Sequence, residues 1–118
     1  MSVTSSRILQ IQFSGDITEN IIQSALDNTV SPAKTDIVSL SIGANTITAP
    51  AVSGIIVTGL TIIPPAGNTS LMTLKGVTGD TGITLHKTDP VSLSLDTTFV
   101  SLVINAAAAI AGVRLIWT

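Results

Sequence analysis

Cysteine is absent from this chain of 118 residues, which excludes disulfide bonds, thiolate metal sites and a thiol nucleophile. Histidine occurs once, as His86, so a zinc site built from several histidines is excluded as well. Tyrosine is missing, and Phe13, Phe99 and Trp117 are the only aromatic residues. The sequence therefore predicts no cofactor and no metal centre, and it offers few rings on which sugars or bases can stack.

Charged side chains are the second scarce class. They make up 10% of the residues, with a formal net charge of -2, whereas about 25% is usual in a soluble domain. Polarity comes instead from serine, threonine and asparagine, and such a neutral surface suits permanent contact with neighbouring chains. The alternative is a monomer whose β surface is rich in threonine. Because the basic residues are scattered rather than gathered in a stripe, we expect no nucleic-acid partner.

No segment is typical of a targeting signal or a membrane span. Residues 1–7 lack the apolar core of a signal peptide. Residues 99–117 are the most apolar stretch and are about long enough to cross a bilayer, but Asn105, Gly112 and Arg114 interrupt them. Two buried strands joined by an alanine-rich connection explain this stretch better, and no membrane partner is expected.

Apolar and polar residues alternate along much of the chain, which predicts an all-β fold. Leu9, Ile11 and Phe13, for example, share one face of a predicted strand, and two glutamines lie on the other face. Similar patterns between turn signals predict further strands at residues 37–42, 46–48, 54–63, 70–75, 83–86, 91–95, 99–104 and 113–117. About eight or nine short strands are typical of a β-sandwich or jelly roll. We expect one such domain over residues 1–118, with residues 1–6 as an N-terminal arm.

Two of these segments carry sharper expectations. Gly43, Ala44 and Asn45 form a turn signal, so residues 46–48 are expected to return as the next strand. Residues 54–63 form a near-continuous apolar run, as expected of a strand that is buried on both faces.

Residues 17–28 leave two alternatives open. Several of their apolar residues fall at helical spacing, and Thr18 with Glu19 can cap a helix. The segment is short, however, and Asn28 and Pro32 bound it. One short helix and an irregular strand are equally compatible with this pattern.

One tripeptide, Asp80-Thr81-Gly82, is shared with aspartic proteases, whose dimeric retroviral type is all-β and of about this chain length. That chemistry needs two carboxylates that share a proton across a dimer axis. The triplet should follow an apolar strand early in the chain, but Gly79 precedes it here and only residues 83–118 follow. We favour the alternative of a tight turn, in which Asp80 accepts hydrogen bonds from backbone amides and glycines adopt positive φ. The chain is not expected to be an enzyme.

The remaining candidate groups are polar residues in turns or on strands. His86 can act as a general base in principle, but no partner is marked by spacing, and we expect it on a strand surface or at an interface. Asp80, Asp89 and Asp96 lie in predicted turns. There they can bind Ca²⁺ through oxygen ligands or, as we favour, cap the turns.

Four segments of the chain have a shared style of short, Thr- and Ser-rich strands and turns: Gly43-Ala44-Asn45-Thr46-Ile47-Thr48, Pro64-Pro65-Ala66-Gly67-Asn68-Thr69, Leu74-Lys75-Gly76-Val77-Thr78-Gly79-Asp80-Thr81-Gly82 and Arg114-Leu115-Ile116-Trp117. Through these segments, most of the chain resembles small structural proteins encoded by tailed bacteriophages. The resemblance implies a capsid decoration (cement) protein at the capsid surface, or a subunit of the tail, baseplate or fibre. It also implies self-association, with a trimer favoured, and contact with other virion proteins such as the major capsid protein.

Apolar residues near the two ends of the chain are the predicted interface residues. They are Ile8 and Ile11 in the first strand and Leu115, Ile116 and Trp117 in the last. Trp117 is the best single anchor, because tryptophan is enriched among interface hot spots. The alternative is that Trp117 fills the core of its own sandwich. A second hypothesis for the whole chain is a receptor- or glycan-binding module.

Overall fold

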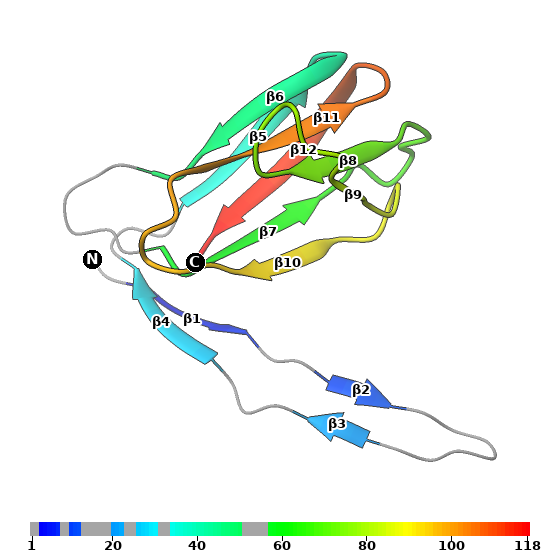
Figure 1. Cartoon of the computed structure of the whole chain (residues 1–118). Helices are drawn as coiled ribbons and strands as arrows, with labels where there is room; N and C mark the ends of the chain where they lie inside the picture. Colours follow the sequence, from blue (N-terminus) through cyan, green and yellow to red (C-terminus); the bar gives the residue numbers. More distant parts are fainter. Residues whose placement is uncertain (1–2, 8–9, 13–19, 23–25, 31–33, 51–56) are drawn as a thin grey trace.

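The computed structural model describes residues 3–7, 10–12, 20–22, 26–30, 34–50 and 57–118. Eight strands form two four-stranded antiparallel sheets around one core, and four short strands form a separate ribbon (Figure 1). The strands of the two sheets are β5 (Lys34–Leu40), β6 (Gly43–Thr48), β7 (Gly59–Ile63), β8 (Met72–Lys75), β9 (Ile83–Thr84), β10 (Val91–Ser94), β11 (Ser101–Ala106) and β12 (Ile110–Trp117). The described residues contain no helix, so the all-β prediction is confirmed.

The strand order is that of a jelly roll. One sheet has the order β10-β7-β12-β5 and the other has the order β6-β11-β8-β9. From β5 to β12 the chain therefore crosses to the opposite sheet at every connection except the β8–β9 hairpin. Pairs far apart in sequence result: Lys34 at the start of β5 lies opposite Trp117 at the end of β12. This arrangement confirms the predicted sandwich of jelly-roll type.

The core lies between the two sheets and is apolar throughout. Strand β12 contributes Val113, Leu115 and Trp117 from alternate positions, as expected of a strand with one face buried. The Trp117 ring lies against Phe99, with 6.3 Å between the ring centroids. No polar or charged residue is buried among those that the structure describes. Apolar burial therefore holds the sandwich together, at about 1.5–3 kcal/mol for each large side chain.

A bulge in β12 keeps its buried residues on the face that points into the core. Ile110 lies opposite Leu40 and Val113 lies opposite Val38, so β12 has one residue more than β5 between these pairs. Gly112 has a φ of 83° there, a conformation that glycine adopts at little cost. Because of the extra residue, Ile110 and Val113 both face the core, although a regular strand would send them to opposite faces.

The turn between β5 and β6 differs from the prediction. It lies at Ser41 and Ile42, and Gly43 already begins β6 with a φ of 96°. The Asn45 side chain closes the turn from inside the strand, because its Oδ1 accepts the Ser41 N–H and its Nδ2 donates to the Ser41 and Gly43 carbonyls. The expected pairing of the return strand with β5 is also wrong, since β6 pairs with β11 in the other sheet. Ile42 is exposed because β5 ends at Leu40.

Strand β7 is shorter than the predicted strand at residues 54–63, of which residues 54–56 lie outside the described residues. Leu60 and Ile62 are fully buried in the core, whereas Thr61 and Ile63 on the other face are only partly covered. The prediction of burial on both faces is therefore wrong for the outer face. The reason is that an antiparallel sheet of a sandwich has one face toward the core and the other toward solvent.

The N-terminal strands form a two-stranded ribbon of β1 (Val3–Arg7), β2 (Gln10–Gln12), β3 (Asn20–Ile22) and β4 (Leu26–Val30). Strand β1 pairs with β4 and β2 pairs with β3, and none of the four pairs with a strand of the sandwich. Figure 1 shows the ribbon extending away from the sandwich, beside the end at which the C-terminus lies. Where residues 17–28 are described they are strand, as the second alternative has it, and residues 3–6 of the predicted arm belong to β1.

Candidate functional site

The predicted interface residues occupy different environments. Leu115 and Trp117 are 2% and 1% exposed within a single chain, so their side chains have no surface left for a neighbour. For Trp117 this is the core position considered as the alternative. Ile116 is half-buried on the outer face of β12. Ile8 lies outside the described residues, and only the backbone pairing of Ile11 in β2 is described.

Asp80 closes the turn between β8 and β9. Its Oδ2 accepts hydrogen bonds from the backbone N–H groups of Gly76 and Val77, at 3.1 and 3.0 Å. Gly82 has a φ of 78°, and a Cβ at this position would lie 2.6 Å from the Leu74 carbonyl oxygen. These contacts confirm the predicted turn, in which the carboxylate caps backbone amides and a glycine adopts positive φ.

Asp96 and His86 close two further turns. Asp96 Oδ2 accepts hydrogen bonds from the hydroxyl and the backbone N–H of Thr98, and the hydroxyl is the main reason that the pKa of Asp96 lies below its ordinary 3.8. His86 Nδ1 accepts the backbone N–H groups of Thr88 and Asp89, at 3.2 and 2.9 Å, which leaves the ring proton on Nε2. The part of the chain that the structure describes holds no group of three or more acidic, histidine or cysteine side chains fit to bind a metal ion.

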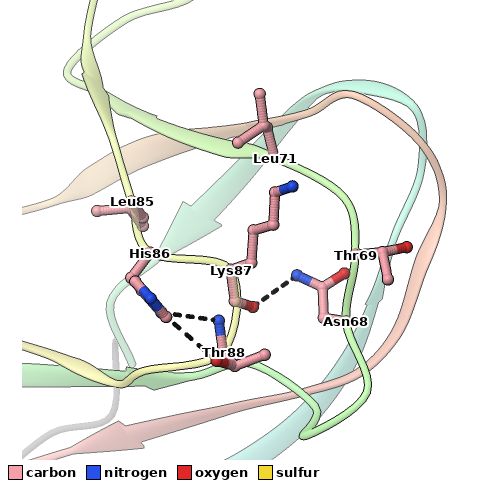
Figure 2. A pocket seen from close by; sticks show the side chains of 7 residues that line it. All are labelled: Asn68, Thr69, Leu71, Leu85, His86, Lys87 and Thr88. Carbon is pink, nitrogen blue, oxygen red and sulfur yellow. Dashed lines mark hydrogen bonds between the residues drawn. The ribbon is translucent and has the colours of Figure 1, made fainter.

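A shallow pocket of about 500 Å³ lies between the β7–β8 and β9–β10 connections (Figure 2). Its lining residues are Asn68, Thr69, Leu71, Leu85, His86, Lys87 and Thr88. Asn68 joins the two connections, because its Nδ2 donates to the Lys87 carbonyl at 2.7 Å and to the Ser70 carbonyl at 3.0 Å. Figure 2 shows the Lys87 side chain directed toward Leu71.

This pocket combines a cation with apolar surface. Among the described residues, the Lys87 ammonium has no ion-pair partner. Of the two leucines that line the pocket, Leu71 is nearly half exposed and Leu85 is half-buried. An ammonium group above an apolar wall can hold a small ligand that carries a carboxylate and an apolar face.

The two sides of the sandwich end in strands of different length. On one side, which we call the long-edge side, β5 has seven residues and β6 has six, and each pairs with only one neighbour among the strands that the structure describes. On the short-edge side, β9 has two residues and β10 has four. An open edge presents unpaired backbone groups to other chains. Ile37, 72% exposed at the middle of β5, adds apolar surface to the long-edge side.

Comparisons of the chain with protein-family models, with curated proteins and with solved structures gave no match. Within the described ranges, no helix is long and apolar enough to cross a membrane.

The structure brings forward two residues to which the sequence pattern gave no role, Ile37 and Lys87, and it gives Asn45 a different position from the expected one. A signal existed for Ile37, because Ile37 and Val38 are adjacent in one strand and only one of them can face the core. The sequence pattern places Asn45 in the turn itself, whereas Asn45 is the third residue of β6 and its side chain donates back to the Gly43 carbonyl. Lys87 had no signal, since its pocket forms only when residues 68–71 come close in the fold.

Proposed function

We propose that this chain is a non-enzymatic structural protein of a virion, a capsid decoration (cement) protein that stabilises contacts between capsid subunits. The resemblance to structural proteins of tailed phages supports this proposal. The jelly roll is also a fold of many viral capsid proteins, although a fold alone does not fix a function. The low share of charged residues fits lasting contact between chains better than it fits a free monomer.

The ribbon is the observation that carries the proposal. Its two ladders contain five and three residue pairs, and no third strand among the described residues joins them. A two-stranded ribbon is at best marginally stable by itself in water, and it needs a further strand or a packed face. The ribbon pairs with no strand of its own sandwich, so a neighbouring chain is the natural support. An arm that reaches from a folded domain to a neighbour is what a clamp between capsid subunits requires.

Capsids of the encoding phage, emptied of DNA and stripped of their decoration, are the partner for the test. We expect the purified protein to co-sediment with them at a fixed ratio of copies to capsid subunits. Hydrogen exchange should be fast at the β1–β4 amides of the free protein and slow once it is bound. Absence of saturable binding would refute the proposal, and binding without protection of the ribbon would refute the clamp.

A matched pair of variants sharpens this test. Asn28→Pro places a residue without an N–H in the middle of β4 and disrupts the ribbon, whereas Asn28→Ala keeps the backbone donor. We expect the proline variant to bind capsids at least about tenfold more weakly than the alanine variant, with an unchanged thermal midpoint of the sandwich.

The pocket beside Lys87 favours a second candidate, a receptor- or glycan-binding module of the tail, baseplate or fibre. Its apolar wall and unpaired ammonium suit an acidic sugar. Oligomers of glucuronic acid should then shift the amide resonances of Leu71 and Lys87, and neutral glucose oligomers should not. Lys87→Gln should abolish the shifts. If the acidic oligomers cause no shift at millimolar concentration, this candidate is excluded.

A further inference from the structure

Strand β5 is the longest open edge among the described strands of the sandwich. It pairs with β12 on one side and with no strand on the other. Proteins usually shorten such edges or place charges along them, because a long uncharged edge recruits other strands. On β5 the charged residues are Lys34 and Asp36, which pair with each other at 3.4 Å. The remaining residues from Ile37 to Leu40 carry no charge.

The sequence of β5 is complementary to itself when two copies run antiparallel. Ile37 is the central residue of this seven-residue strand, so pairing centred on Ile37 aligns the full length of both strands. Ile37 then lies beside its counterpart on the outer face, and Thr35 lies opposite Ser39. Lys34 faces Leu40 and Asp36 faces Val38, so no like charges meet.

Other centres of pairing are worse. Pairing centred on Asp36 would set the two Asp36 carboxylates directly opposite each other, and like charges in that position are destabilising. Pairing centred on Val38 would shorten the ladder and place Ile37 opposite Ser39. The register centred on Ile37 is therefore preferred by length, by charge and by the apolar contact together.

We infer that two copies of this chain pair through their β5 edges, antiparallel about a two-fold axis at Ile37. The β10-β7-β12-β5 sheet of one copy and that of the other then become one continuous sheet. Such an isologous contact closes on itself and yields a dimer, whereas the resemblance by itself implies a trimer. The inference deepens the proposed function, on which it rests for the need to self-associate, by naming the contact between copies.

The contact also determines where the two ribbons lie in the dimer. Lys34 of one copy lies beside Leu40 of the other in this register, and β4 precedes β5 in the chain. Each ribbon therefore starts beside the far end of the β5 strand of the other copy. The two ribbons leave the dimer at opposite ends, so a dimer can reach two neighbours at once.

Solution mass is the first test. Light scattering after size exclusion should give twice the chain mass of 12.0 kDa for the unmodified protein. Ile37→Lys places two ammonium groups opposite each other and should raise the dimer dissociation constant at least about tenfold. Val77→Lys changes a residue that is 62% exposed in the β8–β9 turn and should leave the dimer intact. A monomer at high concentration, or a trimer, would overturn the inference.

Cross-linking tests the register directly, since the natural chain has no cysteine. With Ile37→Cys the two cysteines lie directly opposite, at a Cα separation of about 4.5–5.5 Å, which a disulfide spans. With Ser39→Cys they lie about 13 Å apart along the strands and cannot be joined. We expect a covalent dimer for the first variant alone. A dimer in which Ile37→Cys does not cross-link would show that another surface holds the copies together.

The two proposals fail separately. A dimer through β5 that never binds capsids would refute the proposed function and leave this contact standing. Capsid binding by a protein that is monomeric in solution and does not cross-link at position 37 on the capsid would do the reverse.

Discussion

The long-edge and short-edge sides belong to the same two sheets, but their open edges differ in strand length and in how the adjoining turns are closed. On the short-edge side, β9 and β10 stop after two and four residues, and side chains such as Asp80 and Asp96 close the adjoining turns. On the long-edge side, β5 and β6 run for seven and six residues, and β5 carries an exposed isoleucine, Ile37, with neutral Thr35 and Ser39 two positions away on either side. Among the described strands, short strands and side-chain caps protect one side only, and the other side keeps the open edge at which we propose the contact between copies.

Both sides depend on one core, so the largest effect should come from Trp117. Trp117→Ala removes a side chain that is 1% exposed and contacts Phe99, and we expect a loss of about 3–5 kcal/mol in the free energy of unfolding. Ile116→Ala, on the half-buried outer face of the same strand, should cost about 1 kcal/mol. Both losses can be measured by urea unfolding that is monitored by the circular dichroism of the backbone, a signal that does not depend on Trp117. Equal losses would mean that the outer face is covered in solution.

A change at Asn45 tests the β5–β6 turn on the long-edge side. Its Nδ2 donates to the carbonyls of Ser41, Gly43 and Ile104, at 2.9, 3.0 and 3.2 Å. Asn45→Asp replaces this donor with an oxygen and should cost about 2–3 kcal/mol, because three carbonyls lose their partner. Asn68→Asp on the other connection disturbs two carbonyls and should cost less. The same unfolding experiment ranks the two, and a reversed order would contradict the role given to Asn45.

Gly82 tests the short-edge side. Gly82→Ala forces a Cβ against the Leu74 carbonyl and two side chains, at a φ of 78°, and we expect a loss of about 2 kcal/mol. The β9 amides should lose their protection from hydrogen exchange first. Gly79→Ala is the matched control, since a Cβ there meets nothing within 4 Å, and it should change stability by less than about 0.5 kcal/mol. The dimer should survive both changes, because β5 is untouched.

Much of the fold follows from the sequence because alternation is a local property. Val113, Leu115 and Trp117 alternate with exposed or half-exposed residues, as read from the chain. Pairing is not local, so nothing near β6 reveals that its partner is β11 rather than β5. The exposed site was predicted least well. Among the predicted interface residues, Leu115 is core, and Trp117 is core as its alternative has it, while Ile37 is exposed because Val38 occupies the inward position beside it.

The smallest expected effect concerns Asp96, at the end of the short edge strand β10. The Thr98 hydroxyl and backbone hydrogen bonds lower the pKa of Asp96 from 3.8. A lowered folded pKa stabilises the fold above the unfolded pKa, and this contribution disappears as the pH falls through the folded pKa. Thr98→Val should therefore raise the pKa of Asp96 toward 3.8, and its stability difference from the natural chain should vanish in stronger acid. Carboxyl NMR titration checks this, with Thr97→Val as the control.

The position of β12 in its sheet has a consequence for how the protein is made. This strand lies between β7 and β5, yet it is synthesised after both of them. Until the ribosome has released residues up to Trp117, β5 has no partner on either side and the nascent chain carries an incomplete sheet. Contacts between such distant parts of a sequence form slowly, and unpaired strands invite aggregation while they wait. In the nascent chain, β5 therefore presents both edges, and only the arrival of β12 limits its contacts to one.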